Sequence, residues 1–128
     1  MSEQTSREIR STVTSDGNIE ISIATVEKPT PSENDVLIKV EASPINPSDL
    51  GLLISFAADL DSLSVSGSGD ATVATMKIHP GLMGAMKPRL DQSMQVGNEG
   101  GGVIVDAGAN AKGLIGKTVG AAGGAMYS

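Results

Sequence analysis

The dipeptide Asp16-Gly17 constrains the fold of this chain more than any other short feature of its sequence. It stands between two runs that suit strands, residues 9–14 and 18–26. An Asp-Gly pair between such runs is the strongest short-range signal for a β-hairpin. In the second run isoleucine alternates with other residues over positions 19–23, which is the period of a strand with one buried face. We therefore expect the chain to begin with a hairpin.

A second strand and a short helix are expected next along the chain. In residues 36–42 the β-branched Val36, Ile38 and Val40 alternate with other side chains, which again indicates a strand. Asn46 is a good N-cap residue, and Pro47 is tolerated at the first position of a helix. The pattern predicts a helix that begins at Pro47 and fades near residues 54–60.

Residues 55–95 form a long excursion that is rich in expected loop. Residues 62–70 are small and polar, and they predict a flexible loop. Residues 71–78 suit a short strand or a helical turn, and 81–87 are weakly helical. A connection this long inside one domain is usually functional or disordered. We expect this excursion, together with the helix after Asn46, to line and cover a pocket.

The last part of the chain returns to short strands. Residues 103–105 and 117–119 indicate strands, whereas 120–128 carry no signal that would end a domain. The predicted fold class is mainly β: a partly open β-barrel of short, mostly antiparallel strands with one or two short helices. We expect one domain over residues 1–128, truncated before a further domain.

Composition excludes several classes of protein. A net charge of −6 opposes binding to a nucleic-acid backbone. No apolar window is long enough for a membrane helix, and the N-terminus lacks the apolar core of a secretory signal. The chain has no cysteine and a single histidine, His79, so thiolate and multi-histidine metal sites are not expected. These features predict a cytoplasmic protein with neither a membrane nor a nucleic-acid partner.

Two motifs carry a resemblance to a known family. The first is Asn46-Pro-Ser-Asp49 at the end of the expected strand 36–42. The second is Gly97-Asn-Glu99 ahead of a further strand. With the hairpin before them, these motifs resemble the medium-chain dehydrogenase/reductase family, in its zinc-independent, quinone-oxidoreductase-like branch. The resemblance covers about residues 7–54 and 95–125. It implies a GroES-like substrate domain whose partner, a Rossmann nucleotide-binding domain, is missing from this chain.

The resemblance also implies roles for individual residues. Zinc alcohol dehydrogenases place cysteine and histidine ligands where this chain has Asn46 and Asn98, and amides are poor zinc ligands. It implies an enzyme without zinc that transfers a hydride between NADP or NAD and a small quinone or carbonyl substrate. The cofactor would be bound mainly by the missing domain. Asn46 is the candidate for contact with the cofactor, and Ser48 and Asp49 are the catalytic candidates.

Each candidate also has a purely structural interpretation. Asn46 suits an N-cap, and Asp49 in the first turn of a helix is favoured by the helix dipole. Glu99 suits a buried carboxylate that holds the glycine-rich turn together. Asn98 tolerates left-handed backbone geometry, and His79 suits an exposed loop. The glycine clusters are not followed by a helix, so they do not predict a phosphate-binding loop.

The sequence therefore leaves two alternative functions open. The first is the substrate-side part of an oxidoreductase, inactive alone, and forming a homodimer because apolar interface surface would be exposed. The alternative is a free-standing GroES-like interaction module without catalysis, in which residues 62–70 bind a protein partner.

Overall fold

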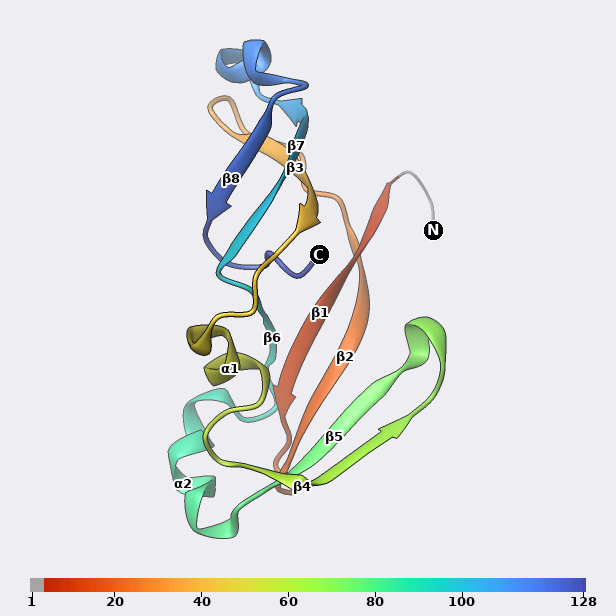
Figure 1. Cartoon of the computed structure of the whole chain (residues 1–128), viewed down its shortest axis with the longest axis vertical. Coiled ribbons are helices and arrows are strands. Elements are labelled where there is room, and N and C mark those ends of the chain that lie inside the picture. Colours follow the sequence, from red (N-terminus) through yellow and green to blue (C-terminus); the bar gives the residue numbers. More distant parts are fainter. Residues whose placement is uncertain (1–3) are drawn as a thin grey trace.

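A computed structural model describes residues 4–128 as two antiparallel sheets with short helices (Figure 1). The first sheet has the strand order β4-β5-β2-β1-β6, and the second has the order β3-β7-β8. The strands are β1 (Thr5–Val13), β2 (Asn18–Glu27), β3 (Val36–Ala42), β4 (Ala58–Ser66), β5 (Val73–Ile78), β6 (Ser93–Gln95), β7 (Glu99–Ala107) and β8 (Thr118–Ala122). The helices are α1 (Pro47–Leu53) and α2 (Met83–Met86), with 3-10 turns η1 (Gly69–Ala71), η2 (Pro80–Leu82), η3 (Lys87–Arg89) and η4 (Ala109–Leu114).

The hairpin predicted at Asp16-Gly17 is confirmed. Strands β1 and β2 pair antiparallel from Val13 opposite Ile19 outward, and the backbone N–H of Thr14 donates to the Asn18 carbonyl at 2.8 Å. Gly17 has φ +93°, a left-handed value that an L side chain rarely adopts. The turn therefore depends on glycine at this position.

The smaller sheet contains the other expected strands. β3 has the predicted bounds and pairs with β7, which in turn pairs with β8. The β3–β7 ladder contains register shifts on both sides of its centre. Gly102 of β7 lies so close to β3 that an added Cβ would stand 1.9 Å from the Lys39 carbonyl oxygen. This close approach accounts for glycine within the strand.

The prediction of a flexible loop at residues 62–70 is wrong over much of that range. Residues up to Ser66 belong to β4, which pairs with β5, and residues 69–71 form η1. Leu63 and Val65 alternate with serines, which is the period of a strand. The abundance of serine obscured that period because both faces of this part of β4 are exposed. Of the two alternatives for residues 71–78, the strand is found, as β5 over Val73–Ile78.

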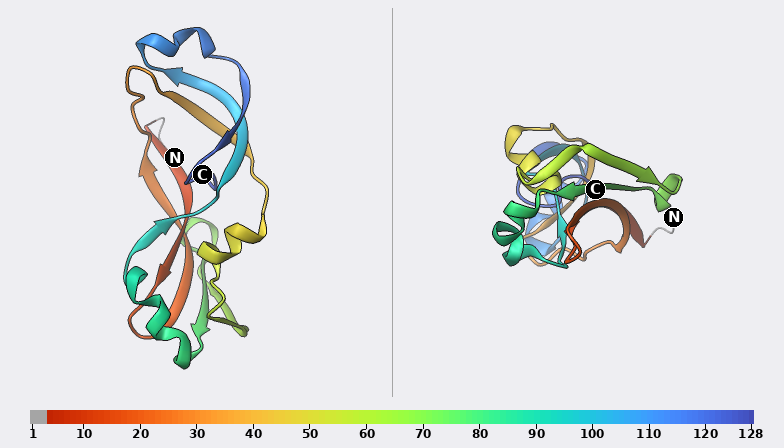
Figure 2. Two further views of the ribbon diagram at one scale, coloured as in Figure 1. Left: turned by 90° about the vertical axis from the view of Figure 1, so that its left-hand side faces the viewer. Right: turned by 90° about the horizontal axis from the view of Figure 1, so that it is seen from below.

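The core lies in the larger sheet rather than inside a barrel. Val13, Ile19, Met76 and Ile78 from the sheet pack with Met86 of α2. The two sheets follow one another along the long axis of the molecule, as two views show (Figure 1, Figure 2). The expected mainly β class with antiparallel strands and short helices is confirmed, and the described residues form two sheets and no closed barrel.

No helix within residues 4–128 combines the length and the apolar character needed to cross a lipid bilayer.

Candidate functional site

The N-terminus of α1 is held by a carboxylate from its own first turn. Asn46 is the N-cap residue and Pro47 occupies the first helical position, as predicted. The backbone N–H of Asn46 donates to Asp49 Oδ2 at 2.7 Å. Asp49 is 1% exposed, so this charge-assisted bond is shielded from water and fixes the start of the helix.

The second oxygen of Asp49 reaches the other motif. Asp49 Oδ1 accepts a hydrogen bond of 3.0 Å from the backbone N–H of Asn98, in the segment between β6 and β7. One buried carboxylate therefore joins two segments that lie 49 residues apart in the chain. The two motifs that carry the family resemblance meet at this point, and we call the meeting point the Asp49 junction.

Two pairs of side chains lie around the junction. Asn46 Nδ2 donates to Glu99 Oε2 at 3.0 Å, and Asn98 Nδ2 donates to Ser48 Oγ at 3.3 Å. Ser48 and Glu99 are exposed and Asn46 and Asn98 are half-buried. The junction therefore presents amide, hydroxyl and carboxylate groups to solvent, while Asp49 lies beneath them.

The structure corrects two interpretations of these residues. Glu99 is exposed, so it is not a buried carboxylate that holds the glycine-rich turn. Asn98 does not have a positive φ; Gly97 takes the left-handed conformation instead, with φ +95°. His79 is exposed, as expected, and precedes η2.

Tyr127 also belongs to the junction, and sequence reasoning assigned it no role. Its hydroxyl donates to the Pro44 carbonyl at 2.9 Å, and its backbone N–H donates to Val96 at 3.3 Å. An added Cβ at Gly97 would stand 2.6 Å from Tyr127 Cδ1. The only sequence signal was that Tyr127 is one of two aromatic residues in the chain.

The hydrogen bonds set the charge state of the junction. The pKa of Asp49 is lowered, first by the Asn46 backbone N–H and then by Asn98 and Tyr127, against an opposing effect of burial. The pKa of Tyr127 is raised, first by burial and then by the negative charge of the nearby Asp49 carboxylate. No basic side chain within residues 4–128 forms an ion pair with Asp49 or Glu99. The junction therefore carries negative charge and a protonated tyrosine at neutral pH.

A large groove borders the junction. Its volume is about 1350 Å³, and its lining includes Ile45, Leu53, Met126 and Tyr127 together with parts of β1, β2 and β3. The expectation that α1 and residues 55–95 line the pocket is largely wrong, because they contribute only Leu53 and Gln95.

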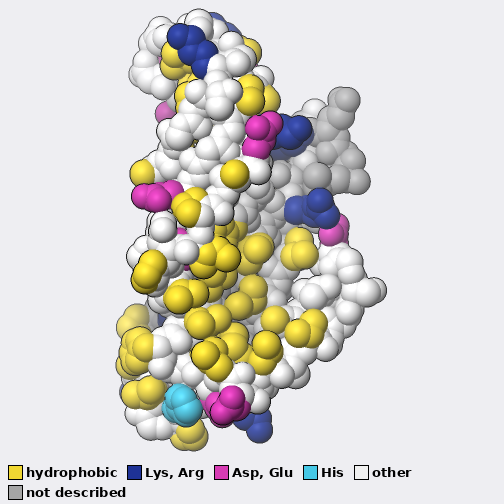
Figure 3. All heavy atoms as spheres, in the orientation of Figure 1, with side chains coloured by type: hydrophobic (Ala, Val, Ile, Leu, Met, Phe, Trp, Pro, Cys, Tyr) yellow, Lys and Arg dark blue, Asp and Glu magenta, His cyan; other side chains and the backbone are white. Residues whose placement is uncertain are grey.

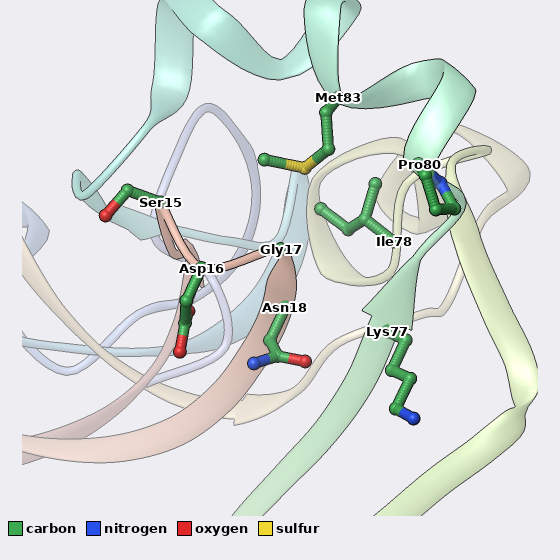
Figure 4. A pocket seen from close by; sticks show the side chains of 8 residues that line it. All are labelled: Ser15, Asp16, Gly17, Asn18, Lys77, Ile78, Pro80 and Met83. Atoms are coloured by element: carbon green, nitrogen blue, oxygen red, sulfur yellow. The ribbon is translucent and has the colours of Figure 1, made fainter.

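A smaller hollow of about 530 Å³ lies at the hairpin turn, away from the junction (Figure 4). It is lined by Ser15, Asp16, Gly17, Asn18, Lys77, Ile78, Pro80 and Met83. Here the excursion does contribute, through β5, η2 and α2.

Among the described residues, no group of three or more histidine, cysteine, aspartate or glutamate side chains is placed to hold a metal ion. No protein-family model and no curated protein matches the chain.

Proposed function

We propose that this chain is the GroES-like, substrate-side domain of a zinc-independent, NAD(P)H-dependent oxidoreductase similar to the medium-chain dehydrogenases/reductases. The observation that carries the proposal is the Asp49 junction. Its carboxylate accepts one backbone N–H from each of the two motifs that resemble the family. Two motifs that resemble one enzyme family and also meet in space support a common site more strongly than either motif alone.

Asp49 acts in this proposal as a positioning residue. It is 1% exposed, and each of its carboxylate oxygens already accepts a backbone hydrogen bond. It therefore orients the exposed Ser48 and the half-buried Asn46 and Asn98 without touching the substrate. Ser48 is the group that meets a substrate carbonyl. Its oxygen accepts from Asn98, so its own hydrogen remains available for donation to a second acceptor.

The residues of the junction fit one end of a nicotinamide cofactor. A primary amide both donates and accepts, so the Asn46 side chain suits the carboxamide of a nicotinamide ring. When bound, the cofactor supplies the hydride that reduces a quinone or carbonyl. Asp49 and Glu99 are acidic and form no ion pair with a described basic residue. The junction therefore does not suit the phosphates, which we assign to a Rossmann domain outside this chain.

A titration followed by NMR tests this proposal on the 128-residue chain. Reduced nicotinamide mononucleotide should shift the backbone amide signals of Ser48, Asn98 and Glu99, and adenosine diphosphate should not. The variant Asn46→Ala should lose the response, whereas Asn110→Ala, an exposed amide on η4, should keep it. Equal shifts with both probes, or none at these residues with either, would overturn the proposal.

The alternative, an interaction module without catalysis, is supported by a different observation. Phe56 and Leu60 are 73% and 60% exposed, and exposed apolar side chains mark many protein interfaces. The intact mass of the natural polypeptide separates the two functions. The mass of a chain of roughly three hundred residues agrees with a two-domain reductase. A mass of 12.9 kDa, that of these 128 residues, agrees with the module.

A further inference from the structure

The edge strand of the larger sheet carries exposed apolar side chains. β4 ends the strand order β4-β5-β2-β1-β6, and Leu60, Leu63 and Val65 on it are 60%, 55% and 63% exposed. Hydrophobic side chains gather over the lower half of this face of the molecule, which contains α1 and the β4–β5 hairpin (Figure 3, compare Figure 1). Soluble proteins usually protect or cover such an edge.

The hydrogen-bond pattern of β5 shows which backbone groups of β4 point outward. The N–H of Ile78 donates to Gly17 on the β2 side, whereas the N–H groups of Lys77 and His79 donate toward β4. The backbone N–H and C=O groups of successive residues point alternately to the two neighbouring strands. Those of Thr75 and Val73 therefore also point toward β4. Their partners are Ser64 and Ser66. The N–H and C=O of Val65, which lies between these two serines, therefore point away from the sheet.

We propose that this edge pairs with the β4 of a second copy of the chain, antiparallel and about a two-fold axis at Val65. In that register each Val65 donates its N–H to the other copy's Val65 carbonyl. The two valines are therefore joined by a pair of backbone hydrogen bonds. Leu63 of each copy lies opposite the end of the other strand, where Gly67, with φ +74°, turns the chain out of β4.

The charges along the edge suit this antiparallel arrangement. Asp59 and Asp61 lie at the start of β4, and the turn after its end carries Asp70, which pairs with Arg7 at 2.9 Å. Antiparallel pairing places the acidic start of one strand beside the end of the other, where Arg7 balances the charge of Asp70. A parallel arrangement would instead oppose the acids of the two copies, which is unfavourable. The edge lies apart from the Asp49 junction, so this proposal does not depend on the proposed oxidoreductase function.

Cysteine cross-linking tests the pairing and its register, because the chain has no cysteine of its own. In Val65→Cys the two sulfur-bearing residues are directly opposite, with Cα atoms about 5.5 Å apart, which suits a disulfide. In Leu63→Cys the two cysteines lie four positions apart along the strands, roughly 14 Å. Ile115→Cys, 45% exposed at the far end of the smaller sheet, is a control for random collision.

Mild oxidation should yield a disulfide-linked dimer from Val65→Cys, and much less from the other two variants. Equal yields from all three, or none from Val65→Cys, would overturn the proposal. Sedimentation velocity gives a second test without oxidation. Val65→Lys places two like charges across the axis and should raise the dimer dissociation constant about tenfold, while Ile115→Lys should leave it unchanged. A monomeric unmodified chain at every concentration tested would also overturn it.

Discussion

The backbone N–H of Asn98 donates to Asp49 Oδ1 at 3.0 Å, and this bond connects the start of α1 with the segment that leads from the larger sheet into the smaller one. The other oxygen of Asp49 caps α1 through Asn46. One buried carboxylate therefore fixes a helix, a connecting segment and the side chains that both present. The integrity of the candidate site depends on the charge and the two acceptor oxygens of Asp49.

Asp49→Asn is expected to destabilise the fold. The amide retains one acceptor oxygen, but its NH₂ group then faces one of the two backbone N–H donors, which leaves a buried donor unsatisfied. The thermal midpoint should fall by at least about 5 °C for a domain of this size, measured by circular dichroism. Ser48→Ala, at the exposed neighbouring residue, should change the midpoint much less. An equal effect of both variants would contradict the role of Asp49.

Acid should weaken the folded state through the same group. The pKa of Asp49 is lowered in the folded state, chiefly by the Asn46 N–H, so the unfolded chain binds more protons in acid. This contribution to stability is present above about pH 4, the usual aspartate pKa, and is lost as pH falls through the lower folded pKa. Urea unfolding of the wild-type chain and of Asp49→Asn at several pH values measures it. The difference between the two proteins should shrink on acidification; a constant difference would contradict the assignment.

The fold was predictable from sequence where local chemistry decides it. The Asp16-Gly17 turn, the bounds of β3 and the start of α1 at Asn46-Pro47 follow from backbone preferences within a few residues. The strand at 58–66 was missed because its serines suggest a loop, and pairing with β5 determines its conformation. The division of the strands between two sheets was not predictable, because it depends on contacts between distant strands that no local pattern specifies.

The candidate site was predictable as a set of residues but not as an arrangement. Asn46, Ser48 and Asp49 were singled out by their motif, yet burial of Asp49 beneath the others depends on the bond from Asn98. Tyr127 was missed because it reaches the junction only through the path of the C-terminal residues past Gly97. Contacts between segments this far apart leave no spacing signal in a single sequence.

Gly102→Ala is expected to disrupt the smaller sheet. The added Cβ would stand 1.9 Å from the Lys39 carbonyl oxygen, so the β3 and β7 backbones must separate, at a cost in unfolding free energy of about 2 kcal/mol or more. Gly120→Ala in β8 meets no atom within 4 Å and should be neutral or slightly stabilising. Urea unfolding of both variants makes the comparison. A Gly102→Ala protein as stable as Gly120→Ala would exclude so close a β3–β7 contact.

Arg89→Lys is expected to loosen the attachment of α1 to the larger sheet. Arg89 Nη2 donates to Ser11 Oγ at 2.9 Å and to the Leu52 carbonyl at 3.2 Å. Arg89 Nη1 also donates to the Gly51 carbonyl at 3.4 Å. The single nitrogen of a lysine ammonium cannot replace both ends of this planar fork, so the unfolding free energy should fall by about 1–2 kcal/mol. Lys87→Ala, at an exposed position in the same turn, should change it by less than about 0.5 kcal/mol. Similar losses in both variants would show that the fork is not required.

Tyr127 provides an optical reading of the junction, because it is the only tyrosine and the chain has no tryptophan. Its pKa is raised in the folded state by burial and by the Asp49 carboxylate. Phenolate absorbance should therefore rise at a higher pH in the folded chain than in the urea-unfolded chain. The unfolded chain should titrate at about pH 10. The stability linked to this group is fully present below that value and is lost as pH rises through the folded pKa. Asp49→Asn should lower the folded midpoint by removing the carboxylate, while burial keeps part of the increase. Identical midpoints in the folded and unfolded chains would place Tyr127 outside the junction.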